Sequence, residues 1–209
     1  MYGDNGPSLS KGDSGGAASD ASEGRGGSAS AVGGQMSTHV QDLLSDIESR
    51  PWMTYRENFP PILDSKYTSD VGWGCMIRSA QMMLAQTLFV ARLGRDFRVG
   101  GGSSGPFTKD PRHRQLLTLF ADLPSERCPF SVHNLLRHAA EDRVRPGSWL
   151  GPSIACRALC RAVNQEQREM LQLRVYLALD CLVSKERVQE TILSSGKAWV
   201  PILVLIPLR

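Results

Sequence analysis

Cys75 is the residue whose position most favours covalent chemistry. From residue 76 to 93 the chain contains no glycine or proline and is apolar on nearly every face, which predicts a buried helix. Cys75 would stand at the first turn of that helix, where unpaired N–H groups and the helix dipole stabilise a thiolate. Free cysteines are more often small buried residues than nucleophiles, so position alone leaves both interpretations open.

The residues just before Cys75 are suited to a substrate that must come close. Gly72 and Gly74 flank Trp73. Glycines remove Cβ bulk where a substrate backbone would approach and allow a sharp turn from loop to helix. The whole segment 52–74 is rich in proline, aromatic, glycine and aspartate residues, which indicates an extended, well-anchored loop. We therefore expect the Cys75 sulfur to be reachable.

The other cysteines suggest neither a disulfide framework nor a metal site. The chain has five cysteines, an odd number at irregular spacing, which favours reduced thiols in the cytosol. Cys156 and Cys160 are four residues apart and would supply half a metal site, but they lie in an apolar stripe and no second pair has ligand spacing. We predict core packing for them, with no metal and no cofactor.

The composition indicates an arm followed by one folded domain. Residues 1–36 are dominated by glycine, serine, alanine and aspartate, so ordering them would cost entropy and bury almost nothing. We expect a disordered arm at 1–36 and one domain at 37–209, where an amphipathic helix begins at Ser37 and runs towards Pro51.

Beyond the central helix, capping signals predict the remaining elements. After a glycine-rich hinge at 94–105 we expect three helices, a strand, a helix and a last strand. They are a helix capped by Asp110 that carries Leu116, Leu117 and Phe120, helices opened by Ser131 and by Gly151-Pro152, a strand at 173–179, a helix between Ser184 and Gly196, and an apolar strand at 198–208 covered on both faces. A core strand so close to the last residue suggests a truncated fold.

Charge and hydropathy argue against two classes of partner. The net charge of +3 comes from 24 basic and 21 acidic residues spread along the chain, without the basic stripe that nucleic-acid binding needs. The first residues have no apolar leader, and the longest apolar run, 200–208, contains two prolines and cannot span a bilayer. We predict a soluble cytoplasmic protein that binds no nucleic acid.

Two long blocks resemble the autophagy-related cysteine endopeptidase family. They are WMTYRENFPPI at 52–62 and YTSDVGWGCMIRSAQMMLAQTL at 67–88. The likeness continues through LGRDF, PFSVHNLL and GSWLGPS and ends at AWVPILVLIPLR, so it covers nearly everything after residue 40. It implies an α+β, papain-like cysteine protease fold at 37–209, of which this chain would be an incomplete, C-terminally truncated copy.

The resemblance also implies a substrate and a reaction. Members of this family cleave after the C-terminal glycine of a ubiquitin-like autophagy modifier and release it from phosphatidylethanolamine through a cysteine acyl-enzyme. The implied partner is that modifier, as precursor and as lipid conjugate. Membrane contact would come only through the lipidated substrate, and no cofactor is implied.

Five residues acquire roles from the same resemblance. Cys75 matches the nucleophile, and Tyr55 matches a tyrosine whose hydroxyl helps to bind the oxyanion. Trp149 matches a tryptophan that covers the cleft over the glycine tail, and Trp73 and Gly74 are expected to contact substrate as well. The plainer alternatives are a half-buried aromatic for Tyr55 and a structural loop residue for Trp149.

The chain departs from the family at the general base. The family's catalytic Asp and His lie in an Asp-Pro-His segment, and no such tripeptide occurs here. His39 lies in the opening helix, His113 in a first turn, and His133 and His138 are five apart and do not share a helical face, so none fits the motif. The alternative function is therefore a catalytically dead form that binds the modifier without cleaving it.

Overall fold

The central helix forms where the sequence is most uniformly apolar. A computed structural model describes residues 37–100, 110–166, 171–193 and 199–208, all within the unit Ser37–Arg209. The predicted arm at 1–36 and part of the predicted hinge at 94–105 lie outside the described residues. Helix α2 (Cys75–Leu93) confirms the predicted central helix, and Gly94, with φ of 95°, ends it.

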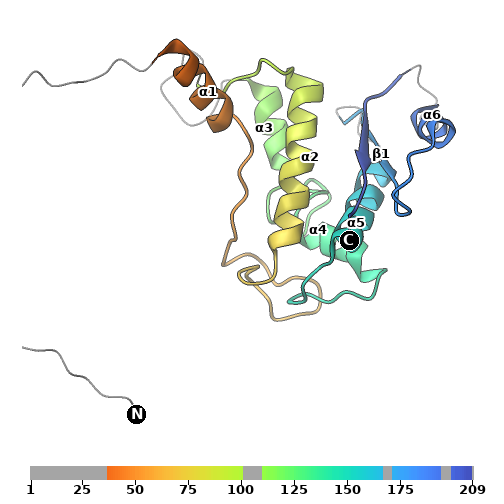
Figure 1. Ribbon diagram of the computed structural model, residues 1–209. Coiled ribbons are helices and arrows are strands. Elements are labelled where there is room, and N and C mark those ends of the chain that lie inside the picture. The colour runs from red at the N-terminus through yellow and green to blue at the C-terminus, as the bar shows by residue number, and fades with distance from the viewer. Residues whose placement is uncertain (1–36, 101–109, 167–170, 194–198, 209) are drawn as a thin grey trace, which may run out of the picture. The chain divides into compact units, whose positions relative to one another are not determined.

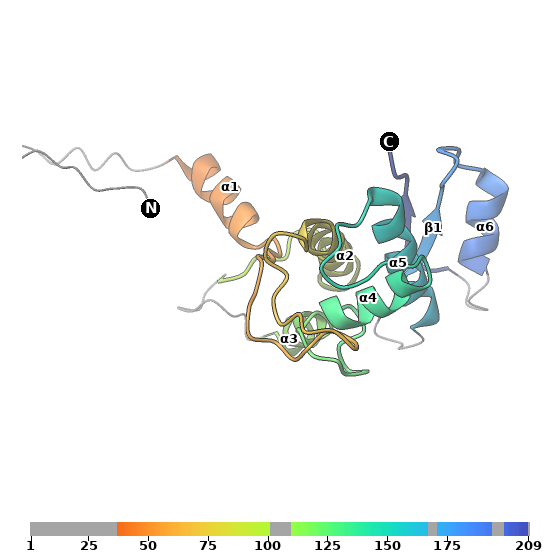
Figure 2. The same ribbon diagram turned by 90° about the horizontal axis from the view of Figure 1, so that it is seen from below.

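Three capped helices pack against α2 (Figures 1 and 2). They are α3 (Pro111–Thr118), α4 (Val132–Ala140) and α5 (Pro152–Gln165). The carboxylate of Asp110 accepts the Arg112 N–H, and the Ser131 side chain accepts the Asn134 N–H, which confirms both predicted caps. Phe120 was expected within the first of these helices, but α3 ends at Thr118 and Phe120 is buried in the turn that follows.

The sheet has two parallel strands in the described part of the chain. Strand β1 (Arg174–Leu177) pairs with β2 (Ile202–Leu205), and Val175 lies opposite Leu203. Strand β1 is contacted by α5 on one side and by α6 (Lys185–Leu193) on the other (Figures 1 and 2). The apolar pattern of the last strand is typical of a strand covered on both faces, but in the described residues only one face is covered: Leu205 is buried and Val204 is exposed.

Helix α1 (Thr38–Glu48) is present, but it does not bury its apolar side chains. Val40, Leu43, Leu44 and Ile47 all remain exposed, and the side chain of Ser37 makes no cap bond. The helix is held at its other end, where Ser49 Oγ accepts the Val99 N–H at 2.8 Å. Its amphipathic pattern therefore predicted the helix correctly but not what the apolar face contacts.

Residues 52–74 contain neither helix nor strand and are held in place by long-range hydrogen bonds. The Phe59 N–H donates to Thr68 O at 3.2 Å, and the Nε2 of His133 on α4 lies 2.7 Å from Pro60 O. The prediction of an extended, anchored loop is confirmed. None of the helices in the described ranges is long and apolar enough to cross a membrane.

Candidate active site

Cys75 is the first residue of α2, at the point where the anchored loop turns into the helix. Its side chain is partly exposed. The carbonyl oxygen of Asp70 accepts the N–H groups of Trp73 (3.2 Å) and Gly74 (2.8 Å), which closes the turn immediately before the cysteine. The first N–H groups of a helix have no intrahelical partner, so the thiol lies where a negative charge is stabilised.

A cavity of about 290 Å³ brings Cys75 and Tyr55 together. One wall is the extended segment that carries Tyr55, and the other is the first two turns of α2. The lining residues are Trp52, Met53, Thr54, Tyr55, Cys75, Arg78, Ser79 and Met82. The Tyr55 side chain is 46% exposed, so its hydroxyl is accessible to a bound substrate. The predicted nucleophile and the predicted oxyanion donor thus share one site.

The two glycines before Cys75 have different reasons to be glycine. Gly72 has φ of +85°, a left-handed backbone conformation that side chains disfavour, and open space around its Cα. Gly74 has an ordinary φ, but a Cβ there would lie 2.6 Å from Asp70 Cβ. Gly74 is therefore required by packing against Asp70, and its predicted contact with substrate would come from its backbone.

The two tryptophans predicted to bind substrate lie in contrasting environments. Trp149 is 75% exposed, and its Nε1 donates to Gly72 O at 2.8 Å. The indole is thereby held at the turn formed by residues 72–74, called the glycine turn below, although Trp149 does not line the cavity. Trp73 is buried, donates from Nε1 to Ser69 O at 3.1 Å and packs edge-on to Tyr67. Any contact of Trp73 with substrate would have to come from its backbone.

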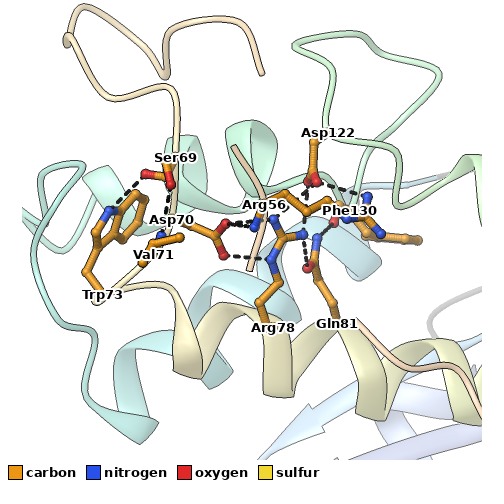
Figure 3. Close-up of polar contacts among 9 residues, drawn as sticks. All are labelled: Arg56, Ser69, Asp70, Val71, Trp73, Arg78, Gln81, Asp122 and Phe130. Atoms are coloured by element: carbon orange, nitrogen blue, oxygen red, sulfur yellow. Dashed lines mark hydrogen bonds and ion pairs between the residues drawn. The ribbon is translucent and has the colours of Figure 1, made fainter. Parts of the chain in front are cut away.

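A largely buried ionic network is centred on Arg78, which also lines the cavity (Figure 3). Arg78 donates from Nε and Nη2 to Asp70 at 2.7 and 3.0 Å, and from Nη1 and Nη2 to Asp122 at 3.1 Å each. Arg56 Nη1 adds a bond of 3.0 Å to Asp122. Gln81 accepts from Arg78 at 3.1 Å and donates to the Phe130 carbonyl at 2.7 Å.

The charges in this network balance, with two arginines facing two carboxylates. Burial by itself would lower the pKa of Arg78, but the hydrogen bonds and charges of Asp70 and Asp122 outweigh it and raise that pKa above its ordinary value. Sequence reasoning missed the network. The available signal was a pair of polar residues, Arg78 and Gln81, three positions apart on one face of an otherwise apolar helix.

None of the histidines lines the cavity. His133 is buried against Pro60, and His39 is exposed on α1. His113 is buried beside Phe89 and Phe97, and burial lowers its pKa despite the charge of Asp110. His138 also has a lowered pKa, mainly through burial. The described residues therefore place no imidazole in the wall of the cavity that contains Cys75.

The two cysteines of α5 behave as small apolar residues. Cys156 and Cys160 are partly buried against the core, and burial raises the pKa of both thiols. This confirms the core-packing prediction. In the described ranges, no three His, Cys, Asp or Glu side chains are grouped so as to hold a metal ion.

Comparison with known proteins identifies a family. The sequence pattern described as the peptidase C54 catalytic domain matches residues 40–209. The chain is 47% identical over 131 residues to "Cysteine protease ATG4B" of Oryza sativa subsp. indica, covering 62% of this chain and 26% of the rice protein. It is 37% identical over 186 residues to "Cysteine protease ATG4A" of Oryza sativa subsp. japonica, covering 79% and 38%. It is 37% identical over 194 residues to "Probable cysteine protease atg4" of Aspergillus niger, covering 81% and 45%. The chain thus spans less than half the length of these relatives.

Proposed function

Because the chain belongs to the peptidase C54 catalytic-domain family, we propose that it is the nucleophile-bearing part of a cysteine endopeptidase of autophagy. The substrate is a ubiquitin-like modifier, cleaved after its C-terminal glycine as a precursor and released from phosphatidylethanolamine as a lipid conjugate. The protein works in the cytoplasm and meets the membrane only through the lipidated substrate.

The family match bears out the resemblance seen in the sequence and the predicted fold class. The fold is the α+β, papain-like cysteine protease fold, and the described residues contain six of its helices and a parallel pair of strands. In this fold class a helix that begins at the nucleophile is the element from which the site is built, and α2 begins at Cys75.

The observation that carries the proposal is the shared cavity of Cys75 and Tyr55 at the N-terminus of α2. The Cys75 thiolate attacks the carbonyl carbon of the glycine, and the carbonyl π electrons move to oxygen. The Tyr55 hydroxyl donates a hydrogen bond to that oxyanion. The amide C–N bond to the next residue, or to the ethanolamine nitrogen of the lipid, then breaks, and the leaving amine takes up, through solvent, the proton that the Cys75 thiol released. The glycine acyl group stays on Cys75 as a thioester until water adds to it, which gives the free glycine carboxylate and returns a proton to the sulfur.

The rest of the proposed site binds the glycine tail. A narrow tail fits between the backbone of the glycine turn, at Trp73 and Gly74, and the exposed face of Trp149. The hydrogen bond from Trp149 to Gly72 places the indole over that turn. A side chain larger than hydrogen next to the scissile bond would meet this ring, which accounts for the proposed selectivity for glycine.

A second candidate function is binding without cleavage. It is favoured by the finding that no histidine lines the cavity, so no imidazole there can act as general base for Cys75. Removing the partners of a catalytic nucleophile costs roughly 10⁴-fold or more in rate. In this case the Cys75–Tyr55 cavity would serve as a docking groove for the modifier tail.

The test is cleavage of a modifier precursor that carries residues beyond its C-terminal glycine. The chain is compared with its Cys75→Ala variant, and with Cys181→Ala as the matched control because Cys181 is exposed and outside the cavity. We expect product from the chain and from Cys181→Ala, and none from Cys75→Ala. Equal product from Cys75→Ala would refute the protease assignment. Saturable binding of the mature modifier without any product would support the second candidate.

A further inference from the structure

The Asp70 carboxylate lies between the two walls of the cavity and bonds to both. Its Oδ1 accepts the backbone N–H of Arg56, the residue after Tyr55, at 2.8 Å. Its Oδ1 and Oδ2 also accept from Nη2 and Nε of Arg78, one turn after Cys75 on α2, at 3.0 and 2.7 Å. Figure 3 shows the carboxylate between these two donors.

The backbone of Asp70 makes the same connection a second time. Its N–H donates to Arg56 O at 3.2 Å, and its carbonyl oxygen accepts the Gly74 N–H at 2.8 Å. Asp70 is therefore bonded to the neighbour of Tyr55 and to the neighbour of Cys75. These five hydrogen bonds of one residue join the segment around Tyr55 to the start of the helix.

The packing around Asp70 leaves it no alternative position. Its side chain is completely buried, and it lies so close to Gly74 that a Cβ at position 74 would collide with it. A buried carboxylate is costly unless it is paired and hydrogen-bonded, and the bonds from Arg56 and Arg78 supply that pairing. The position of Asp70 accordingly determines how the two walls are spaced.

We propose that Asp70 is a positioning residue that sets the separation of Tyr55 from Cys75. Its bearing on catalysis rests on the proposed function, but the geometric claim does not. Two reacting groups displaced by about 1 Å can lose on the order of 10²-fold in rate, so a small change in this spacing has a large effect. Asp70 acts through its bonds to Arg56, Gly74 and Arg78, and not through the Tyr55 hydroxyl or the Cys75 sulfur.

Asp122 provides a matched control within the same network. It bonds to Arg78 and to the guanidinium of Arg56, and its side chain is almost as buried as that of Asp70. All of these contacts of Asp122 are made with guanidinium groups, and none of them involves the backbone next to Tyr55 or Cys75. Asp122→Asn thus removes the same charge from the same arginine without releasing the wall that carries Tyr55.

The spacing is measured by cross-linking, which needs no enzymatic activity. Tyr55→Cys places a second thiol in the cavity, and dibromobimane fluoresces once both of its arms have reacted with thiols. Peptide mapping by mass spectrometry identifies the 55–75 cross-link, and the parent chain without Tyr55→Cys gives the background from its other cysteines. All variants are labelled well below their melting temperatures, so a loss of global stability does not change the readout.

We expect rapid 55–75 cross-linking in Tyr55→Cys and in Tyr55→Cys/Asp122→Asn. In Tyr55→Cys/Asp70→Asn the rate should fall roughly tenfold or more, because the wall is no longer held at the original spacing. Equal rates in the Asp70→Asn and Asp122→Asn variants would overturn the proposal. Absence of the cross-link in Tyr55→Cys itself would also overturn it, since the two walls would then not be adjacent.

Gly74→Ala covers the case in which Asp70→Asn does not fold. The added methyl displaces Asp70 while every charge is retained, so slower cross-linking in Tyr55→Cys/Gly74→Ala is again expected, and an unchanged rate would contradict the proposal. The outcome is distinguishable from failure of the proposed function. Cleavage by Cys75→Ala would refute the protease and leave the cross-linking result intact, whereas unaltered cross-linking in Asp70→Asn would refute only the positioning role.

Discussion

The indole Nε1 of Trp149 donates a hydrogen bond of 2.8 Å to the carbonyl oxygen of Gly72. This bond joins the segment before α5 to the glycine turn that precedes Cys75. The indole ring is otherwise largely exposed, so the bond orients a large apolar surface beside the site instead of burying it. An exposed aromatic side chain held in one orientation is suited to contact a ligand.

Replacement of Trp149 should therefore weaken substrate binding more than catalysis. For Trp149→Ala we expect KM for the modifier precursor to rise roughly tenfold, equivalent to about 1.4 kcal/mol, because a hydrogen bond and an aromatic contact are lost. Trp199→Ala is the matched control, since Trp199 is equally exposed at 75% and does not line the cavity. The same rise in KM for both variants would show that Trp149 has no special role.

Tyr55→Phe should lower kcat, whereas Trp149→Ala should raise KM. Loss of the hydroxyl removes a donor needed only when the oxyanion forms, so kcat should fall on the order of 10²- to 10³-fold with little change in KM. Tyr176→Phe is the control because Tyr176 lies on β1, outside the cavity, and its hydroxyl donates to Leu182 O. If kcat of Tyr55→Phe stayed within about threefold of the parent, the oxyanion role would be excluded.

Stability should decrease as the pH falls below about 6.5, because His113 and His138 both have a pKa below the ordinary value of 6.5. Burial is the main cause in each case. The folded chain binds these protons more weakly than the unfolded chain, so stability rises with pH, is complete above about pH 6.5 and is lost as the pH falls through the folded pKa values.

The measurement for this pH effect is Tm by circular dichroism between about pH 7.5 and 5.5. His113→Phe should reduce the decrease in Tm, since a phenylalanine keeps the ring contacts with Phe89 and Phe97 and takes up no proton. His39→Gln is the control, because His39 is exposed on α1. A pH dependence unchanged in His113→Phe would assign the effect to other groups.

Two glycines with the same backbone conformation should differ in their response to alanine. Gly72 and Gly147 have φ of +85° and +86°, but a Cβ has open space at Gly72 and collides with the ring of Tyr67 at Gly147. Gly72→Ala should cost about 1 kcal/mol in the free energy of unfolding, as expected for a left-handed conformation alone. Gly147→Ala should cost roughly 1–3 kcal/mol more, as overpacking does. Urea denaturation with unchanged m-values measures both, and equal costs would contradict the collision.

Much of the fold was predictable because its signals are local. Helix α2 follows from an uninterrupted apolar run, and α3 and α4 begin where Asp110 and Ser131 cap them. The same local signals predicted that Cys75 starts a helix. They did not predict the unburied apolar side of α1, because burial depends on what packs against an element.

The amino-acid sequence alone determined the family, the helix that begins at Cys75 and the anchored loop before it. Only the tertiary structure decided that Tyr55 shares a cavity with Cys75, that Trp73 is buried while Trp149 is exposed, and that Asp70 and Asp122 converge on Arg78. The physical reason is one of range. Periodicity and capping depend on neighbours within a few residues, whereas a cavity and a buried ion network depend on the path of the whole loop, which close packing and long-range hydrogen bonds set.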